Sequence, residues 1–161
     1  MVRFKVRWIL FELVQDPIID NDKKVIFPRT PAKLCDDDLN KCIHSAMTID
    51  YGDFGQGMAR SVYVKWFNSA TKVGIARVPR DYTDMMLASL FFIKKVCDQP
   101  YSFRILHVSG TIIEVQKHAI LRDRDIYLQE QEDAQKKGQP YSFVEKLASS
   151  EKGIKKIQAF A

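Results

Sequence analysis

The N-terminal strand pattern constrains the fold of this chain more than any other stretch of its sequence. Basic residues alternate there with aromatic and aliphatic ones, and successive side chains of a strand point to opposite faces. Three cations therefore share one face, namely Arg3, Lys5 and Arg7. A row of cations on a strand favours contact with a polyanion; the alternative is a solvated edge strand whose charges oppose aggregation.

The same face of this strand becomes apolar further along. Its next positions are Ile9, Phe11 and Leu13. Exposed apolar surface of this extent marks an interface. We therefore expect either a third helix or a partner protein to cover these three residues.

The order of the predicted elements indicates an α+β fold. Strands are expected at residues 3–14, 61–67, 72–78 and 101–108, and helices at about 36–47, 81–97 and 111–128. The first six follow the β-α-β-β-α-β order of ferredoxin-like domains, which RNA-recognition (RRM-like) domains share. The sequence predicts a ferredoxin-like α/β sandwich: a four-stranded antiparallel sheet with two helices on one face, plus additional C-terminal helices.

With 161 residues the chain has the length of one domain. Residues 1–128 are expected to form an RNA-binding sandwich, with an irregular insertion at 15–34 that is rich in Pro, Asp and Asn. Residues 51–57 are glycine-rich, lack the ending of a phosphate-binding loop and are expected to form a turn. Residues 129–161 are polar to basic, and we expect one or two short helical turns there.

The net charge of +5 favours an acidic partner, most simply a nucleic acid. The surplus is concentrated between residues 60 and 80, a stretch without any acidic residue. Its five basic residues are Arg60, Lys65, Lys72, Arg77 and Arg80. Aromatic residues on the same strands are candidates for stacking on bases, namely Tyr63, Phe67 and Phe103. The alternative for these aromatic residues is a purely structural role in the sheet.

Several function classes lack support in the sequence. The three cysteines, Cys35, Cys42 and Cys97, lack C-x-x-C spacing and suggest free thiols in a reducing compartment. Together with His44 they do not show the spacing of four tetrahedral zinc ligands, so we expect no metal site. No apolar run reaches membrane-spanning length, and the N-terminus does not resemble a signal peptide, so we expect no membrane partner. No histidine has the spacing of a catalytic residue, so we expect no catalytic residues.

A strand-to-helix junction is the most suggestive short motif. Ser109 is placed to cap the following helix, Gly110 lets another group approach the backbone, and the free N–H groups after Thr111 form an anion site. Lys117 follows about two turns along the helix. The alternative is an ordinary helix cap with no ligand.

Four stretches, taken together and in order, resemble one protein family. They are residues 1–13, the turn at 52–55, the segment Gly74-Ile-Ala-Arg77 with Thr71 and Arg80, and Val108-Ser-Gly-Thr-Ile112. The family is that of the fifth Pop ("processing of precursors") protein subunits of eukaryotic ribonuclease P and RNase MRP. The resemblance covers about residues 1–14 and 52–128. Where the family usually has a cysteine this chain has Val78, followed by Pro79.

The resemblance implies a non-catalytic, RNA-binding subunit of an RNA-based endoribonuclease. In that family the RNA holds the catalytic magnesium ions and removes the 5′ leader of precursor tRNA, and a related RNA in RNase MRP processes ribosomal RNA precursors. No cofactor is implied for the protein itself. The implied partners are the ribonuclease P or MRP RNA, a TIM-barrel-like protein subunit, other Pop subunits and precursor tRNA, in the nucleus and nucleolus.

The expected RNA contacts combine the basic residues, which lack nearby acids, with the junction. They are Arg3, Lys5, Arg7, Arg60, Lys65, Arg77, Arg80, Ser109, Gly110, Thr111 and Lys117. The alternative function is a small ferredoxin-like enzyme, for instance a phosphoester or acyl-phosphate hydrolase that uses Arg77 or Arg80.

Overall fold

A computed structural model describes residues 5–26 and 33–157 of the chain. In this part the fold is α+β, with a five-stranded antiparallel sheet, a separate two-stranded hairpin and four α-helices. The strands are β1 (Val6–Gln15), β2 (Ile18–Ile19), β3 (Val25–Ile26), β4 (Tyr63–Asn68), β5 (Val73–Pro79), β6 (Lys95–Val96) and β7 (Gln99–Ser109). The helices are α1 (Asp36–Ala59), α2 (Thr83–Phe92), α3 (Ile112–Lys136) and α4 (Phe143–Lys155), with a short 3-10 turn at Arg80–Tyr82.

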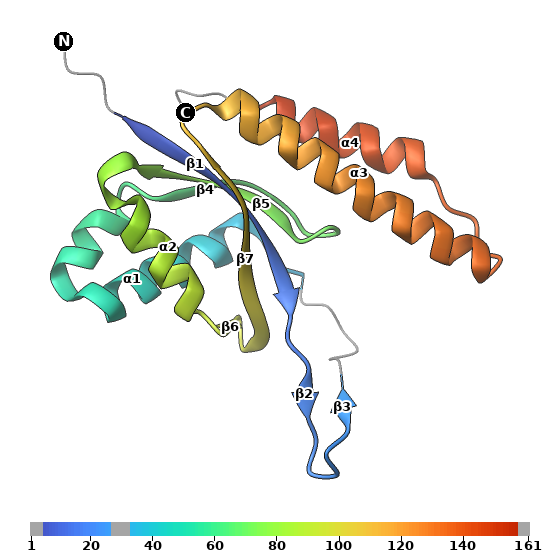
Figure 1. Cartoon of the computed structure of the whole chain (residues 1–161), viewed down its shortest axis with the longest axis horizontal. Helices are drawn as coiled ribbons and strands as arrows, with labels where there is room; N and C mark the ends of the chain where they lie inside the picture. The colour runs from blue at the N-terminus through green and yellow to red at the C-terminus, as the bar shows by residue number, and fades with distance from the viewer. Residues whose placement is uncertain (1–4, 27–32, 158–161) are drawn as a thin grey trace.

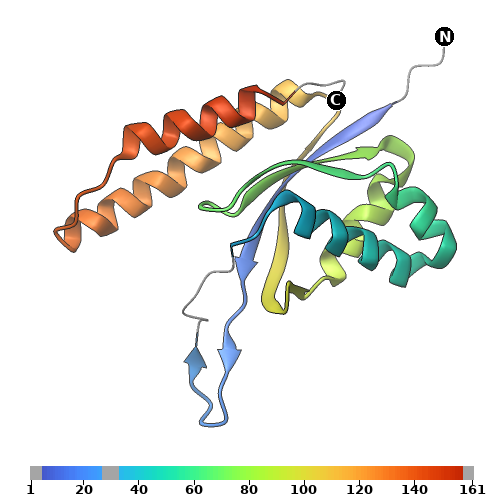
Figure 2. The ribbon, with the colours of Figure 1, turned by 180° about the vertical axis from the view of Figure 1, so that it is seen from behind.

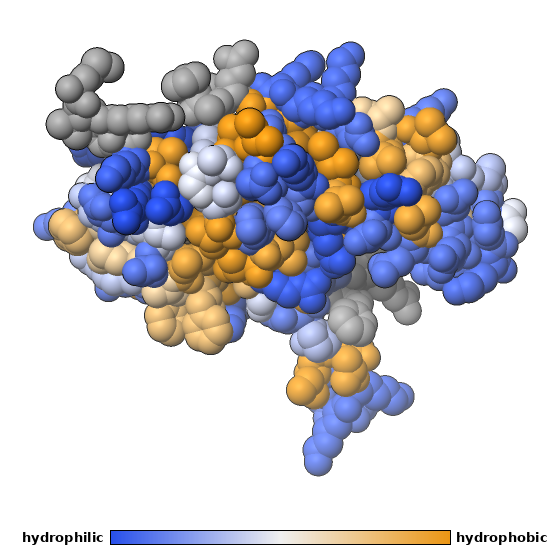
Figure 3. Space-filling model, turned by 45° about the horizontal axis from the view of Figure 1, so that its top comes forward, coloured by the Kyte–Doolittle hydropathy of each residue, from blue (hydrophilic) through white to orange (hydrophobic). Residues whose placement is uncertain are grey.

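The first strand lies at the centre of the sheet. The spatial order is β4-β5-β1-β7-β6, so β1 pairs with β5 on one side and with β7 on the other (Figure 1). The hairpin of β2 and β3 projects away from the sheet in the region expected to be irregular. Its four strand residues are exposed and apolar, and its tip is hydrophilic (Figure 3).

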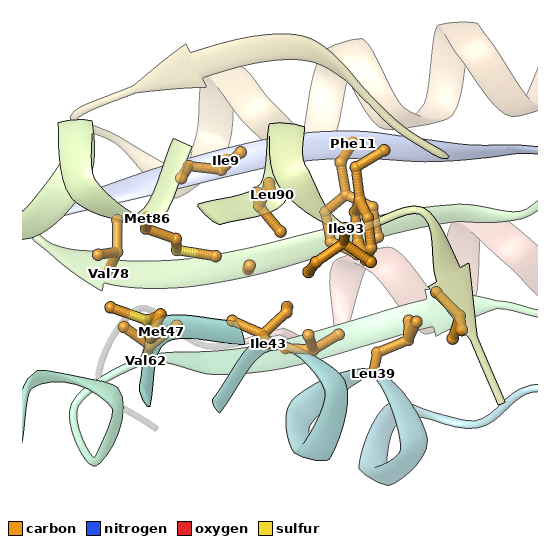
Figure 4. Close-up of a cluster of buried hydrophobic side chains, with 14 of the residues drawn as sticks. Ile9, Phe11, Leu39, Ile43, Met47, Val62, Val78, Met86, Leu90 and Ile93 are labelled. Carbon is orange, nitrogen blue, oxygen red and sulfur yellow. The ribbon is translucent and has the colours of Figure 1, made fainter. Parts of the chain in front are cut away.

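One face of the sheet packs against α1 and α2. Ile9 and Phe11 point into this core (Figure 4), and Leu13 belongs to the same buried cluster. Their exposed fractions are 0%, 0% and 5%. They contact a cluster that includes residues of both helices, such as Leu39, Ile43, Met47, Met86 and Leu90. The prediction that these three residues form a partner interface is therefore wrong. They are the alternate residues of β1 whose side chains face α1 and α2.

The opposite face of the sheet is covered by α3 and α4. These two helices form an antiparallel pair on the far side of the sheet from α1 and α2 (Figure 2). Trp8 and Leu10 of β1 point to this opposite face, and each is 1% exposed. They pack with Val115 and Ala119 of α3 and with Ile154 of α4. The third helix thus covers the opposite face from the one expected.

Buried polar groups join α3 and α4 to the sheet. Asp123 of α3 has no exposed surface and accepts hydrogen bonds from Thr71 Oγ1 at 2.7 Å, from Asn68 Nδ2 at 3.1 Å and from the hydroxyl of Ser150 in α4. Because these partners come from the β4–β5 turn and from α4, Asp123 fixes α4 against both α3 and that turn.

A second carboxylate, Glu12, makes a similar connection on the same face of the sheet. Its carboxylate pairs with Arg104 of β7 and with Arg122 of α3, whose Nε lies 2.7 Å away. Glu12 is buried, so its charge requires these two partners.

Several expected boundaries differ from the structure. Residues 51–57 are helical rather than a turn, and the expected turn is reduced to a break at Gly52, whose φ is 61°. The second helix ends at Phe92, because residues 95–100 form a hairpin in which Cys97 and Asp98 have φ of 49° and 60°, as a type I′ turn requires. The C-terminal helices are longer than expected, since α3 runs to Lys136 and α4 has 13 residues.

Candidate nucleic-acid interface

Four strand ends meet at one end of the sheet. Because neighbouring strands are antiparallel, β1 and β4 begin where β5 and β7 end. The register places Ser109, Trp8, Arg77 and Tyr63 opposite one another on successive strands. Cross-strand partners share a face, so these four residues form a row about 14 Å long at a strand spacing of about 4.8 Å.

The basic residues of two distant sequence segments converge on this end. We call this set the cationic end: Lys5, Arg7, Arg60, Lys65, Arg77 and Arg80. In the described ranges none of these six side chains forms an ion pair with a carboxylate. Arg3 lies outside the described residues. The arrangement concentrates positive charge without internal neutralisation, which suits a polyanion.

Two of these cations affect one another directly. The pKa of Lys65 is lowered, first by partial burial of its ammonium group and then by the positive charge of Arg77. The Nε–H of Arg77 is buried and, among the residues described, has no hydrogen-bond acceptor. An anion bound between them would favour the charged form of Lys65 and supply an acceptor for Arg77.

The junction after β7 lies beside Arg7. A Cβ built on Gly110 would lie 3.2 Å from Nη1 of Arg7, so the guanidinium group sits against the glycine backbone. The helix N-cap is Thr111 rather than Ser109, and Thr111 makes no capping bond with its side chain. Ser109 Oγ instead accepts a hydrogen bond from the N–H of Thr111 at 3.2 Å. The prediction that Ser109 caps the helix is therefore wrong.

Lys117 differs from the other predicted contacts because it has an acidic neighbour. Its Nζ lies 3.1 Å from Glu114 Oε1, one turn earlier on α3, and both side chains are well exposed. The expectation that no acid lies near this lysine is wrong. An exposed pair of this kind stabilises the protein by at most about 1 kcal/mol, so either partner can be exchanged for an external ion.

The structure adds basic residues that sequence reasoning left in an unassigned tail. Gln116 Nε2 donates to the carbonyl oxygens of Ile154 and Ile157 at 2.8 and 3.1 Å, which holds the end of α4 against the start of α3. The exposed lysines at the end of α4 are thereby brought to the side of the molecule where α3 begins. They are Lys152 and Lys155 on its last turn and Lys156 directly after it. The sequence showed that these residues are positively charged, but it did not predict that α4 packs antiparallel to α3.

The cysteines and the possible metal ligands were also located in the structure. The three cysteines are free thiols, and burial is the main cause that raises the pKa values of Cys42 and Cys97. Within residues 5–26 and 33–157 no group of three or more His, Cys, Asp or Glu side chains is arranged to hold a metal ion. No helix in these ranges is long and apolar enough to cross a membrane.

Comparison with known proteins identifies the family of the chain. Residues 7–120 match the model of the Rpp14/Pop5 family. The chain is 33% identical to the ribonuclease P/MRP protein subunit POP5 of Schizosaccharomyces pombe over 77% of this chain and 89% of that protein. It is 30% identical to the human protein of the same name, over 77% of this chain and 73% of that protein.

A chain in a cryo-EM structure of yeast Ribonuclease MRP has a TM-score of 0.49 and 14% identity, over 84% of this chain and 98% of that chain. The assignment rests instead on the sequence relatives and on the family model, which matches the chain from β1 to the first part of α3. The chain belongs to the Rpp14/Pop5 family.

Proposed function

We propose that this chain is a non-catalytic, RNA-binding protein subunit of ribonuclease P, of RNase MRP or of both. The observation that carries the proposal is its membership of the Rpp14/Pop5 family, whose sequence relatives are named as ribonuclease P/MRP protein subunits. The protein is then one component of an RNA-based endoribonuclease and does not cut RNA by itself. Nothing in the comparisons favours the phosphoester or acyl-phosphate hydrolase considered as the alternative.

The cationic end is the proposed contact with the RNA. Its six basic side chains come from β1, β4, β5 and the residues next to these strands, and they have no carboxylate partners among the residues described. Phosphates supply the missing negative charge, and each contact releases counterions from the RNA. Lys117 and the lysines at the end of α4 extend this surface along the outer helices.

The junction of β7 and α3 is proposed to hold one phosphate of that RNA. Arg7 lies against Gly110, and the first N–H groups of α3 follow directly after Thr111. The guanidinium group, the backbone donors and the positive end of the helix dipole all favour an anion there. Gly110 leaves room for it because a side chain would already contact Arg7.

A protein partner is proposed to bind the outer surface of α1 and α2 rather than the buried face of β1. A groove of about 280 Å³ between these helices is lined by Cys42, Ile49 and Phe92, and Phe91 lies beside it. Ile49, Phe91 and Phe92 are 83%, 69% and 63% exposed. We assign this groove to another protein subunit of the same assembly, the TIM-barrel-like one, because apolar side chains this exposed are costly in a free monomer.

Further elements of the proposal follow from the family resemblance. The strand order β7-β1-β5-β4 and the order β-α-β-β-α-β along the chain support a ferredoxin-like core, to which β6, α3 and α4 are added. Magnesium ions are assigned to the partner RNA and no cofactor to the protein. Other Pop subunits and precursor tRNA complete the proposed assembly, with a nuclear and nucleolar location.

Purification of the tagged chain from its own cells tests the proposal. Sequencing of the RNA that accompanies the protein is expected to yield the ribonuclease P RNA, the MRP RNA or both. The purified assembly is expected to remove the 5′ leader from a precursor tRNA, or to cut a ribosomal RNA precursor, while the isolated chain cuts neither. An isolated chain that hydrolyses a phosphoester or an acyl phosphate would instead support the enzyme alternative.

A further inference from the structure

Tyr63 is the most exposed of the three strand aromatic residues that were candidates for stacking. Phe103 is 9% exposed and Phe67 is partly buried, and both pack with the core beneath α1 and α2. Tyr63 is 42% exposed, at the first position of the edge strand β4. A structural role in the sheet therefore accounts for Phe67 and Phe103, whereas the ring of Tyr63 remains available to stack on a ligand.

The ring of Tyr63 is held in a fixed position. Its hydroxyl donates a hydrogen bond to the carbonyl oxygen of Arg60. The ring of His44 meets it at 71° with centroids 6.5 Å apart, and His44 is itself anchored by a 2.8 Å contact between its Nε2 and the carbonyl oxygen of Val62. A ring that is already ordered loses little entropy when a ligand stacks on it.

Two cations adjoin this ring. Lys65 Nζ lies 5.4 Å from the centroid of the Tyr63 ring, and Arg77 is the cross-strand partner of Tyr63 on β5. Neither cation has a carboxylate partner within the described ranges, and the Nε–H of Arg77 lacks an acceptor there. A ring flanked by unneutralised cations matches both parts of a nucleotide, namely its base and its phosphate.

We propose that Tyr63, Lys65 and Arg77 bind one unpaired nucleotide of the partner RNA, with its base stacked on Tyr63 and its phosphate held by the two cations. This inference rests on the proposed RNA-binding function and adds the kind of RNA recognised there. A base inside a duplex is covered on both faces by its neighbours, whereas an unpaired base can be splayed out onto an aromatic side chain. The site therefore selects a single-stranded segment or a bulge rather than a helix.

Two probes and four forms of the full chain test this site. The probes are an oligouridylate of ten nucleotides and a blunt RNA duplex of ten base pairs. Each probe is titrated with the protein at several salt concentrations. The unmodified chain is compared with Tyr63→Leu, which removes the ring, and Tyr63→Phe, which keeps the ring but loses the hydroxyl. Tyr141→Leu is the matched control, because Tyr141 also has a lysine over its ring, Lys146 at 4.0 Å, but lies in the connection between α3 and α4.

Tyr63→Leu is expected to weaken binding of the oligouridylate about fivefold or more, which is the lower end of the effect of one stacked base. The salt dependence should stay unchanged, because no charge is lost. With Tyr63→Leu, the affinity for the duplex should stay within about twofold of that of the unmodified chain. Tyr63→Phe keeps the ring and should lose less affinity for the oligouridylate than Tyr63→Leu does. Tyr141→Leu should bind both probes within about twofold of the unmodified chain. Equal loss of both probes with Tyr63→Leu, or no loss of either, would overturn the nucleotide site.

Photocrosslinking of the unmodified chain keeps the test independent of how the variants fold. A 5-iodouridine version of the same oligouridylate is expected to crosslink to Tyr63, and crosslinks confined to other residues would contradict the site. If the unmodified chain binds neither probe, the RNA-binding proposal itself fails. If it binds both and Tyr63 is neither crosslinked nor needed, only the nucleotide site fails.

Discussion

The guanidinium group of Arg7 lies against Gly110, with 3.2 Å between Nη1 and the position that a Cβ on Gly110 would take. Arg7 lies near the start of β1 and Gly110 directly follows the end of β7, so this contact joins two neighbouring strands at the cationic end. The backbone of Gly110 is not in the left-handed region, so a side chain there would be limited by Arg7 and not by its own φ.

Gly110→Ala is therefore expected to displace Arg7 while leaving the fold nearly intact. The nearest atom is the end of a flexible side chain that can move by a few tenths of an ångström, so the free energy of unfolding should change by less than about 1 kcal/mol. RNA affinity should fall by about tenfold, because a phosphate held by Arg7 and the backbone donors loses its geometry. Chemical denaturation and RNA titration measure the two effects.

Gly110→Val extends this test, because a larger side chain should obstruct the phosphate more. Ser109→Ala is the matched control at the same junction, since it removes only the hydroxyl that accepts from Thr111. Because one exposed hydrogen bond is lost, it should destabilise the fold by about 1 kcal/mol or less. If Gly110→Val lowers stability and assembly of the ribonucleoprotein in proportion, the junction serves the fold and holds no phosphate.

The buried carboxyl group of Asp123 predicts a pH dependence of stability. Its pKa is raised above the usual value of 3.8, mainly because burial disfavours the carboxylate, although hydrogen bonds from Ser150, Thr71 and Asn68 oppose this. The folded chain therefore holds this proton more tightly than the unfolded chain does. The resulting stabilisation is complete below the unfolded pKa and is lost as the pH rises through the folded pKa.

Asp123→Asn provides the neutral reference for this prediction. The free energy of unfolding of the parent chain minus that of the variant should decrease from about pH 4 upward and become constant above the raised pKa. Urea denaturation at a series of pH values measures it. A difference that grows with pH would show that the hydrogen bonds outweigh burial and that the direction of the shift is wrong.

The exposed groove of α1 and α2 predicts poor behaviour of the isolated chain. We expect self-association at high protein concentration, because Ile49, Phe91 and Phe92 present apolar surface to water. The double substitution Phe91→Ser and Phe92→Ser should reduce the association and also weaken binding of the TIM-barrel-like subunit. Light scattering and pull-down measure the two effects.

Val144→Ser is the control for this prediction, because Val144 is 75% exposed but lies on α4, away from the groove. It should leave both measurements unchanged. A parent chain that stays monomeric at high concentration, with partner binding unaffected by the double substitution, would exclude the groove as the protein interface.

Local patterns predicted most elements of this fold but not how they pack. Alternation along β1 identified the strand, but both of its faces are apolar from Trp8 to Phe11, so the sequence did not reveal which face α1 and α2 cover. The position of α4 depends on contacts distant in sequence, such as Ser150 with Asp123. The β6–β7 hairpin interrupts an apolar run that has helical spacing, because Cys97 and Asp98 adopt positive φ.

The candidate interface was partly predictable for a similar reason. The stretch between positions 60 and 80 has basic residues and no acidic ones, which predicted that its cations bind an anion. Antiparallel pairing of β4, β5 and β1 brings these basic residues near the start of β1. Composition alone did not distinguish Tyr63 from Phe67 and Phe103, because exposure depends on strand position and helix cover. Lys117 pairs with Glu114 because the two residues are three positions apart on α3. This pairing could be predicted only once both residues had been placed on the same helix.

The cationic end as the RNA contact is the central claim, and charge reversal within the assembly tests it most directly. Tagged chains carrying Arg7→Glu with Arg77→Glu are compared with the unmodified chain and with Lys136→Glu. Lys136 ends α3, about 36 Å along the helix from its start. We predict that the ribonuclease P or MRP RNA co-purifies with the unmodified chain and with Lys136→Glu but not with the double variant, while all three chains melt within a few degrees of one another. Equal recovery of the RNA with all three would contradict the claim.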